Sequence, residues 1–264
     1  MEKNCYTPCM IDSHCHLVDA KFDADLDAVI SKAIAAGVDR MICIGDTIEE
    51  SQKCLQIAEK HEQIFCTIGM HPHCASSWEI TRDQVPMVKM LSSKKAVAVG
   101  EIGLDYHYMH SPKEVQQRAF REQLLLAKKL QKPAVVHCRD AIADIRLIIA
   151  EVELPRIVIH CCTEKWEDVE PLVAVGHFLS FTGIATFPAS EEMRRTIRMC
   201  PIEQLMVETD SPYLTPIPYR GKRNEPAYVV EVAKCVAQEK GIELAEVDRI
   251  TTENTVQFFG LPDS

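Results

Sequence analysis

Short apolar runs in this chain of 264 residues repeatedly end at a side chain that can bind a metal ion. Five of these runs read MIDSHCH, AVAVGE, PAVVH, RIVIH and LMVETD, and the metal-binding candidates within or at the end of them are His14, His16, Glu101, His137, His160 and Asp210. Parallel strands that close into a barrel carry all their carboxyl ends to one face, where residues far apart in the sequence meet in one pocket. Imidazole and carboxylate groups together suit divalent cations that activate water. The pattern therefore predicts a barrel with a hydrolytic metal site.

Eight runs rich in apolar and β-branched residues predict the strands of this barrel. They are Met10–Asp12, Arg40–Ile44, Ile64–Ile68, Ala96–Gly100, Pro133–Val136, Arg156–Ile159, Phe178–Phe181 and Leu205–Val207. Longer segments with helical periodicity separate them, and Pro226–Lys240 and Leu244–Phe259 are predicted to be two closing helices. Because the strands are continuously apolar, we expect helices to cover the sheet. Eight strand–helix units predict a single-domain α/β fold over residues 1–264, a TIM-type (β/α)8 barrel, with a doubly wound open sheet as the alternative.

The composition is acidic, with a formal net charge of −10. Basic groups that neutralise phosphates supply most of the non-specific affinity for DNA, so tight binding to long duplexes is disfavoured. The segment YRGKRN at 219–224 is a local basic patch, so DNA ends or single strands are not excluded as partners. No apolar stretch is long enough to cross a bilayer, and the 12 cysteines are too sparse for a disulfide framework. We expect a monomeric, cytoplasmic protein without membrane association.

The placement of the candidate ligands favours a metal site over scattered polar residues. His14 and His16 are two residues apart, and residues i and i+2 of a strand point to the same side. Glu101 ends an apolar strand, where a carboxylate is costly to bury unless it is paired or bound to metal. His137 and His160 each end an aliphatic run. One such histidine is ordinarily a core residue, but two of them beside four other candidates favour ligands.

Asp210 completes the predicted set in the segment VETDSP. Its carboxylate can bind metal, act as a general base on activated water, or do both. The alternative is a helix N-cap or an Asx-turn before Pro212. Glu208 lies two residues earlier on the same side, and Asp12 precedes the histidine pair, so both are candidates for orienting the ligands. Four histidines and two carboxylates can supply two ions with about three ligands each, leaving positions for water and substrate.

Seven segments of the chain resemble, in the same order, the TatD family of metal-dependent deoxyribonucleases, within the wider group of amidohydrolase-type barrels. They are IDSHCHL (11–17), GMHPH (69–73), VGEIGLDY (99–106), HCRDA (137–141), IHC (159–161), ETDSPYL (208–214) and PYRGKRNEP (218–226). Together they extend over nearly the whole chain. The resemblance implies a single TatD-like metal-dependent hydrolase barrel.

The resemblance also assigns the six candidates to two divalent ions. It implies that one ion is held by His14, His16 and Asp210. Glu101 would bridge to a second ion held by His137 and His160. The implied reaction is hydrolysis of DNA phosphodiester bonds, typically as a 3′–5′ exodeoxyribonuclease with Mg²⁺, in which Asp210 and Glu101 are the catalytic residues. Ligand chemistry instead favours Zn²⁺ or Mn²⁺. Two other interpretations stay open: an amidohydrolase or deacylase acting on a small-molecule or aminoacyl substrate, and a non-enzymatic barrel with structural metals.

Six further residues are predicted to contact substrate: Arg139, His73, Tyr106, Arg220, Lys222 and Arg223. Arg139 is the first candidate for binding phosphate oxygens, and Tyr106 is a candidate for stacking on a base or sugar. His71 is expected to shape a turn with Pro72. The chain departs from the usual family pattern at Asp46-Thr47 and at Cys162-Thr163-Glu164, and we expect neither departure to touch a metal ligand.

Overall fold

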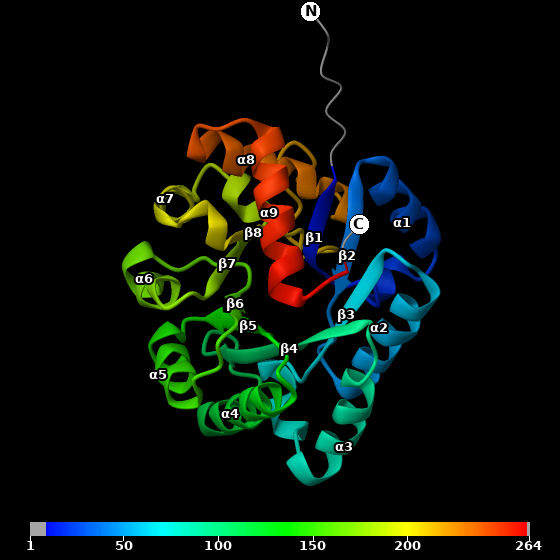
Figure 1. Cartoon of the computed structure of the whole chain (residues 1–264), viewed down its shortest axis with the longest axis vertical. Helices are drawn as coiled ribbons and strands as arrows, with labels where there is room; N and C mark the ends of the chain where they lie inside the picture. The colour runs from blue at the N-terminus through cyan, green and yellow to red at the C-terminus, as the bar shows by residue number, and fades with distance from the viewer. Residues whose placement is uncertain (1–8, 263–264) are drawn as a thin grey trace, which may run out of the picture.

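Eight parallel strands, hydrogen-bonded to one another in chain order, form the centre of the protein in a computed structural model that describes residues 9–262 (Figure 1). The strands are β1 Met10–Cys15, β2 Val38–Cys43, β3 Ile64–Ile68, β4 Ala96–Asp105, β5 Ala134–Arg139, β6 Ile157–Ile159, β7 Phe178–Phe181 and β8 Leu205–Val207. Past its end, β8 returns to β1 through a parallel bridge between Cys15 and Ser211, and the backbone N–H of Asp210 donates to the carbonyl of His14 at 2.9 Å. The predicted (β/α)8 barrel is therefore confirmed.

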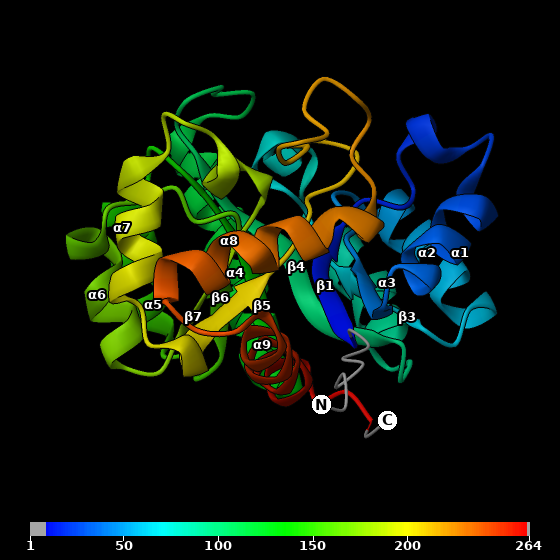
Figure 2. The ribbon, with the colours of Figure 1, turned by 90° about the horizontal axis from the view of Figure 1, so that it is seen from above.

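Helices follow the strands and surround the barrel (Figures 1 and 2). The α-helices are α1 Leu26–Ala35, α2 Ile48–Lys60, α3 Ile80–Leu91, α4 Lys113–Leu130, α5 Ile142–Val152, α6 Trp166–Ala174, α7 Glu191–Met199, α8 Val229–Lys240 and α9 Leu244–Phe259. Short 3-10 helices are η1 Ala20–Phe22, η2 Pro72–Ser77, η3 Gly183–Thr186, η4 Ile202–Gln204 and η5 Pro226–Tyr228. Both predicted closing helices are present, although the first residues of the segment Pro226–Lys240 form η5 rather than α8.

Three strands continue past the apolar runs that predicted them. β1 extends beyond Asp12 to Cys15, β4 beyond Gly100 to Asp105, and β5 beyond Val136 to Arg139. The added residues are polar or mixed because the carboxyl end of the barrel surrounds a polar pocket, whereas the amino end surrounds an apolar core. A prediction based on hydrophobicity alone therefore placed the ends of these strands too early in the sequence.

The amino end of the barrel is closed by apolar side chains. Inside the barrel, Ile11, Phe65 and Val135 belong to one buried cluster with Phe258 and Phe259 of α9. Figure 2 shows α9 at the end of the barrel where β1 begins, while the long loop after β8 rises at the opposite end. Since α9 closes one end, the carboxyl ends of the strands are left as the open face on which a site can form.

The 11 cysteines among residues 9–262 are all free thiols, and most of them are buried. The Sγ atoms of Cys43 and Cys54 lie 3.3 Å apart beside β2, and a buried free cysteine packs as a small apolar residue. Within the same described residues, no helix combines the length and the apolarity that crossing a membrane requires.

Candidate metal centre and substrate pocket

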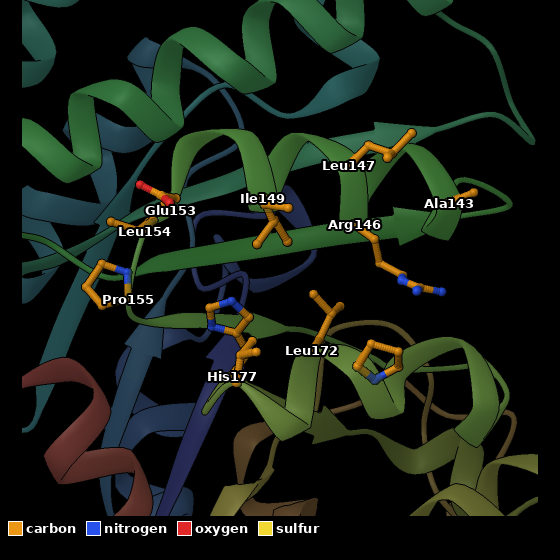
Figure 3. A pocket seen from close by; sticks show the side chains of 12 residues that line it. Ala143, Arg146, Leu147, Ile149, Glu153, Leu154, Pro155, Leu172 and His177 are labelled. Atoms are coloured by element: carbon orange, nitrogen blue, oxygen red, sulfur yellow. The ribbon is translucent and has the colours of Figure 1, made fainter.

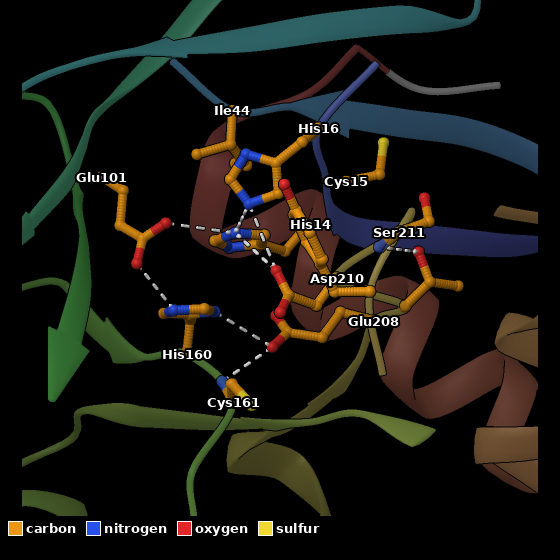
Figure 4. A network of polar contacts seen from close by, with 12 residues as sticks. His14, Cys15, His16, Ile44, Glu101, His160, Cys161, Glu208, Asp210 and Ser211 are labelled. Atoms are coloured by element: carbon orange, nitrogen blue, oxygen red, sulfur yellow. Dashed lines mark hydrogen bonds and ion pairs between the residues drawn. The ribbon is translucent and has the colours of Figure 1, made fainter. Parts of the chain in front are cut away.

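The six predicted ligands meet at the carboxyl end of the barrel. Figure 4 labels His14, His16, Glu101, His160 and Asp210 among them. Five of them line a cavity of about 570 Å³: His16, Glu101, His137, His160 and Asp210. The sixth, His14, is completely buried behind them. His14 and Asp210, 196 positions apart in the chain, thus share one site with the other four, because each ligand lies within or just after a strand of the same barrel.

The first group of ligands surrounds the Nε2 atom of His14. This nitrogen lies 3.2 Å from Nε2 of His16, 3.5 Å from Oδ1 of Asp210 and 3.3 Å from Oε2 of Glu101. His16 Nε2 is also 3.2 Å from the same Asp210 oxygen. Ligand atoms about 2.0–2.2 Å from a tetrahedral ion are separated from one another by about 3.3–3.6 Å. The spacing of these donor atoms therefore fits a divalent ion between them.

The second group surrounds the other oxygen of Glu101. Oε1 lies 2.8 Å from Nδ1 of His137, 2.8 Å from Nε2 of His160 and 3.5 Å from Nε2 of His71. Glu101 is 2% exposed, so both of its oxygens are available only to these neighbours and to small molecules in the cavity. One carboxylate thus faces both groups of imidazoles, which is the arrangement that a ligand shared by two ions requires.

His71 is a member of this centre that the sequence interpretation did not assign. Its Nδ1 accepts a hydrogen bond from the backbone N–H of His73 at 3.1 Å, so it does shape the turn before η2, as expected. Its Nε2, however, faces Glu101, and the side chain is buried. The available signal was the same as for the other ligands, because His71 follows the apolar strand Ile64–Ile68 after only two residues.

The buried imidazoles and carboxylates of the centre shift one another's pKa. Burial lowers the pKa of His16, but the carboxylates of Asp46 and Asp210 outweigh it and raise the pKa to about 10. Burial likewise lowers the pKa of His160, and Glu101 reverses the effect and raises it well above its ordinary value. The opposite holds for Glu101. Burial raises the pKa of its carboxyl, but the neighbouring imidazoles outweigh burial and lower the pKa well below its usual range. Cations are thus required around Glu101, and divalent ions can take the place of the protons.

The backbone before Glu101 is held by close packing on both sides. A Cβ atom added to Gly69, just past β3, would lie 2.6 Å from the carbonyl oxygen of Gly100. A Cβ atom on Gly100 would lie 2.8 Å from the Cβ atom of Val135 in β5. Glycine is needed at both positions because the chains approach too closely for a side chain, and this packing sets the position of Glu101.

Asp12 supports the first group of ligands from behind. Its carboxylate accepts hydrogen bonds from the backbone N–H of Thr209 at 2.8 Å, from the Thr209 hydroxyl at 2.5 Å and from the backbone N–H of His14 at 3.3 Å. Burial raises the pKa of Asp12 to about 8 in spite of these bonds. The contacts join β1 to the segment after β8, so Asp12 positions the strand ends that carry His14 and Asp210.

Glu208 holds His160 from the side opposite Glu101 (Figure 4). One oxygen of Glu208 lies 3.3 Å from Nδ1 of His160 and accepts the backbone N–H of Cys161 at 2.7 Å. The other oxygen accepts the Ser180 hydroxyl at 2.6 Å. A carboxylate on the second ring nitrogen orients an imidazole and increases its basicity as a ligand.

Asp210 uses its backbone for the turn and its side chain for the site. Its carbonyl oxygen accepts the N–H of Tyr213 at 2.9 Å, and its φ of 56° lies in the left-handed region that aspartate tolerates better than most residues. Its carboxylate instead contacts His14 and His16. The carboxylate is thus directed at the imidazoles, whereas an Asx-turn would have directed it at the backbone.

Two predicted substrate contacts line the cavity, and an unpredicted aspartate contacts one of them. Arg139 is exposed at the rim, and Nε2 of His73 donates to Oδ2 of Asp105 at 2.8 Å. The same Asp105 oxygen lies 3.2 Å from Nε2 of His137. Burial raises the pKa of Asp105, but the contact with His137, the backbone N–H of Tyr108 and the His73 ring outweigh it and keep the pKa low. Asp105 therefore connects a candidate ligand to the substrate side of the pocket.

The structure does not bring Tyr106 to the cavity. Its hydroxyl donates to Oδ2 of Asp144 at 2.7 Å, and the ammonium of Lys113 lies 4.1 Å from the centre of its ring. Tyr108, two residues later, lines the cavity instead. Because β4 continues to Asp105, the turn that follows directs Tyr106 toward the helices and Tyr108 toward the mouth.

The basic loop at 219–224 also lies outside the residues that line the cavity. The guanidinium of Arg223 pairs with Asp25 at 2.7 Å and packs over the ring of Phe22. The guanidinium of Arg220 stacks 4.0 Å from the ring centre of Phe187. Lys222 is exposed and likewise does not line the cavity. Arg223 holds the loop to the segment after β1. Contact of this patch with substrate outside the cavity stays a prediction.

One departure from the family pattern reaches a ligand, contrary to our expectation. Oδ2 of Asp46 lies 3.6 Å from Nδ1 of His16, and its backbone carbonyl accepts the N–H of His71 at 2.9 Å. Glu164, in the other departure, lies 3.6 Å from the thiol of Cys138 and does not line the cavity. The contact joins the residues after β2 to His16, just past the end of β1.

A second cavity, of about 680 Å³, lies between α5 and α6 (Figure 3). Its lining is mainly apolar and shares no residue with the metal-centre cavity. None of the metal-binding groups found among residues 9–262 lies there. His177 points into it beside Ile149 and Leu172, is 5% exposed, and has a buried Nδ1 atom without a hydrogen-bond partner. This cavity has no group of side chains that supports hydrolysis.

Buried His177 makes a testable contribution to stability in acid. Burial lowers its pKa in the folded protein, while in the unfolded chain it titrates near 6.5. The unfolded state therefore binds more protons below pH 6.5, and the free energy of unfolding falls by up to about 1.4 kcal/mol per pH unit. We expect His177→Gln to lose less stability than the wild type between pH 7.5 and pH 5.5 in urea titrations. Equal losses in the two proteins would exclude His177 as a source of acid sensitivity.

Comparison with known proteins agrees with the geometry of the metal centre. A model of the family described as TatD related DNase matches residues 11–260. The uncharacterized metal-dependent hydrolase YabD of Bacillus subtilis is 36% identical over 253 residues, which cover 95% of this chain and 98% of that protein. The 3'-5' ssDNA/RNA exonuclease TatD of Escherichia fergusonii is 34% identical over 260 residues, which cover 96% of this chain and 99% of the relative.

A solved structure extends the likeness to three dimensions. The crystal structure of YJJV, a TatD homolog from Escherichia coli K12, matches with a TM-score of 0.92 and 27% sequence identity, and the match covers 97% of this chain and 100% of that one. The family match, the relatives and the solved structure all extend over nearly the full chain. The resemblance seen in the motifs is thereby confirmed, and the chain belongs to the TatD family.

Proposed function

We propose that this protein is a metal-dependent hydrolase that cleaves DNA phosphodiester bonds and removes nucleotides from 3′ ends. The observation that carries the proposal is the position of Glu101, whose two oxygens each face a separate group of imidazoles. The relatives support it, because one is named a metal-dependent hydrolase and another a 3'-5' ssDNA/RNA exonuclease.

The donor atoms suggest which residues hold two divalent ions. His14, His16 and Asp210 would hold one, and His137 with His160 would hold the other, with Glu101 shared between them. Ions bound there would supply Lewis-acid activation of water and would neutralise charge on the phosphate. The imidazole-rich donor set favours Mn²⁺ or Zn²⁺ for tight binding, and Mg²⁺ is the ion that the family resemblance implies.

The protein's own groups would position the reactants and move a proton. Asp210 is held ionised, because contacts with His16 and His14 outweigh burial and lower the pKa of its carboxyl. Its carboxylate borders the cavity and is our candidate for accepting a proton from the attacking water. Arg139 and His73 line the same cavity and are the candidates for binding the non-bridging phosphate oxygens.

End-labelled DNA tests the proposal directly. Metal-stripped protein would be reconstituted with Mg²⁺, Mn²⁺ or Zn²⁺ and given single-stranded DNA labelled at its 5′ end, in parallel with simple ester and amide substrates. We expect a ladder of products shortened from the 3′ end. The same strand labelled at its 3′ end should release the label as a mononucleotide. Intact DNA with every metal, together with turnover of an ester or amide, would reject the nuclease and favour the amidohydrolase alternative.

A further inference from the structure

The pocket is poorly equipped to attract nucleic acid by charge. Among the residues that line the cavity, Arg139 is the single lysine or arginine, whereas Asp46 and Glu50 add carboxylates near the ligands. The whole chain carries a formal net charge of −10. Proteins that bind DNA mainly through phosphates use several basic contacts and depend steeply on salt. If the substrate is DNA, the basic side chains of the pocket supply few phosphate contacts, so contacts with the bases are needed as well.

One exposed aromatic ring stands on the rim after β4. Tyr108 lines the cavity and is 59% exposed. Its ring stacks nearly parallel to the imidazole of His110, with centroids 5.9 Å apart and an interplanar angle of 7°. The rings of His107 and His73 meet it edge-on at 4.8 Å and 5.6 Å. These three imidazoles support the ring without covering most of its surface.

A second exposed ring stands on the rim after β8. Tyr213 lines the cavity, is 45% exposed, and lies edge-on to the imidazole of His16 with centroids 6.2 Å apart. Its hydroxyl donates to the carboxylate of Asp19, and the ammonium of Lys21 lies 4.2 Å from its ring centre. The hydrogen bond limits rotation of the ring, so it is presented in one orientation.

The two rings stand on opposite sides of the pocket mouth. In a closed barrel whose eight strands pair in chain order, β4 and β8 are four positions apart, which places them across the barrel from each other. Tyr108 borders the His73 and Asp105 side of the pocket, and Tyr213 borders His16. The candidate ligands lie between them.

We propose that Tyr108 and Tyr213 stack on the bases that flank the scissile bond, so that stacking rather than phosphate charge binds the substrate. The inference rests on the proposed nuclease function and specifies its substrate as a single strand. Bases of a duplex are already stacked on one another, whereas every unpaired base offers a free face to an aromatic side chain. A duplex would have to be frayed at its end before either ring could bind.

Variants and modified substrates test this together. Loss of one base–ring contact should lower kcat/KM for single-stranded DNA by about tenfold in Tyr108→Ala and in Tyr213→Ala. Tyr108→Phe and Tyr213→Phe retain the ring and should recover most of that loss. Val85→Ala removes a side chain that is 72% exposed on α3, outside the pocket lining, and serves as the control. Metal affinity, measured by calorimetry, should be the same in Tyr108→Ala as in the wild type.

Abasic substrates separate stacking from a structural effect of the variants. The wild type should cleave a strand with an abasic nucleotide beside the scissile bond about tenfold more slowly than an intact strand. The alanine variant that lacks the ring for that missing base should cleave the abasic strand as fast as the wild type does. Each phosphate contact to a single strand contributes about −0.7 to the slope of log affinity against log salt, so we expect a slope no steeper than about −1.5.

The outcomes distinguish the inference from the function on which it rests. Stacking is rejected, and the nuclease function is kept, if the wild type degrades single strands and both alanine variants have the same kcat/KM as the wild type. The same conclusion follows if the variants lose kcat/KM by the same factor on intact and on abasic strands. A steep salt slope would reject it too, because phosphate contacts would then dominate. If the wild type cleaves no DNA with any metal, the proposed function itself is wrong.

Discussion

Replacing Glu101 with glutamine is expected to reduce kcat/KM by about three orders of magnitude or more, since a metal centre supplies several kcal/mol of charge stabilisation. The reason is the position of the carboxylate, which contacts His14 through one oxygen and His137 and His160 through the other. Glutamine keeps the size of the side chain but removes its charge and replaces one ligand oxygen with an amide nitrogen. One proposed ion therefore loses its shared ligand, and the other keeps only a neutral amide oxygen in place of a carboxylate oxygen.

The measurement is hydrolysis of single-stranded DNA by metal-loaded Glu101→Gln, with circular dichroism to check the fold and calorimetry to measure metal binding. Glu170→Gln is the matched control, because Glu170 is exposed on α6 and far from the cavity lining. We expect the control to match the wild type in all three measurements. A folded Glu101→Gln protein with near-normal activity and metal affinity would show that Glu101 bridges no ions.

Removing divalent ions should abolish hydrolysis and lower the thermal stability of the protein. A ligand at a thousand times its Kd stabilises the folded state by about 4 kcal/mol, which corresponds to about 10 °C in Tm for a chain of this size. The effect is expected here because the ion would replace protons among buried carboxylates and imidazoles, as the raised pKa values of His16 and His160 indicate. Returning Mn²⁺ or Zn²⁺ should restore Tm at lower concentrations than Mg²⁺.

Differential scanning calorimetry of chelator-treated and reloaded protein checks this expectation, with DNA hydrolysis measured on the same samples. Glu101→Gln provides the comparison, since it should show a smaller rise in Tm at each metal concentration. Tm and activity that do not change on chelation would reject the metal centre. A response to Mg²⁺ at lower concentrations than to Mn²⁺ would show that the imidazole-rich donor set does not govern metal choice.

The parts of the site that were predictable lie at the ends of strands. Runs such as the one before His137 are continuously apolar because the strand is buried on both faces, so the sequence marks where the strand lies. A polar side chain that directly follows such a run must face the open end of the barrel. This reasoning located His160 and Glu101 without any knowledge of which strands are neighbours.

The parts that were not predictable lie in the loops. No short repeat in a loop sequence indicates the direction in which its side chains point. Tyr106 and Tyr108 lie in the same turn after β4. Only the extension of β4 to Asp105 decides which of the two side chains reaches the cavity. Arg223 belongs to a basic segment, but its charge is committed to Asp25, which lies 198 residues away in the chain. Neither the direction of Tyr108 nor the ion pair of Arg223 depends on local secondary-structure propensity, so the sequence motifs could not predict them.

By itself, the sequence predicted the positions of the eight strands, the barrel they form and the family, because hydrophobic burial and the residues at strand ends follow short, local patterns. Only the tertiary structure decided that His71 joins the centre, that Asp46 approaches His16 and that Tyr108 and Tyr213 both line the pocket. These are contacts between side chains on different loops. Their geometry depends on how the closed barrel places each loop, which no segment of the sequence specifies alone.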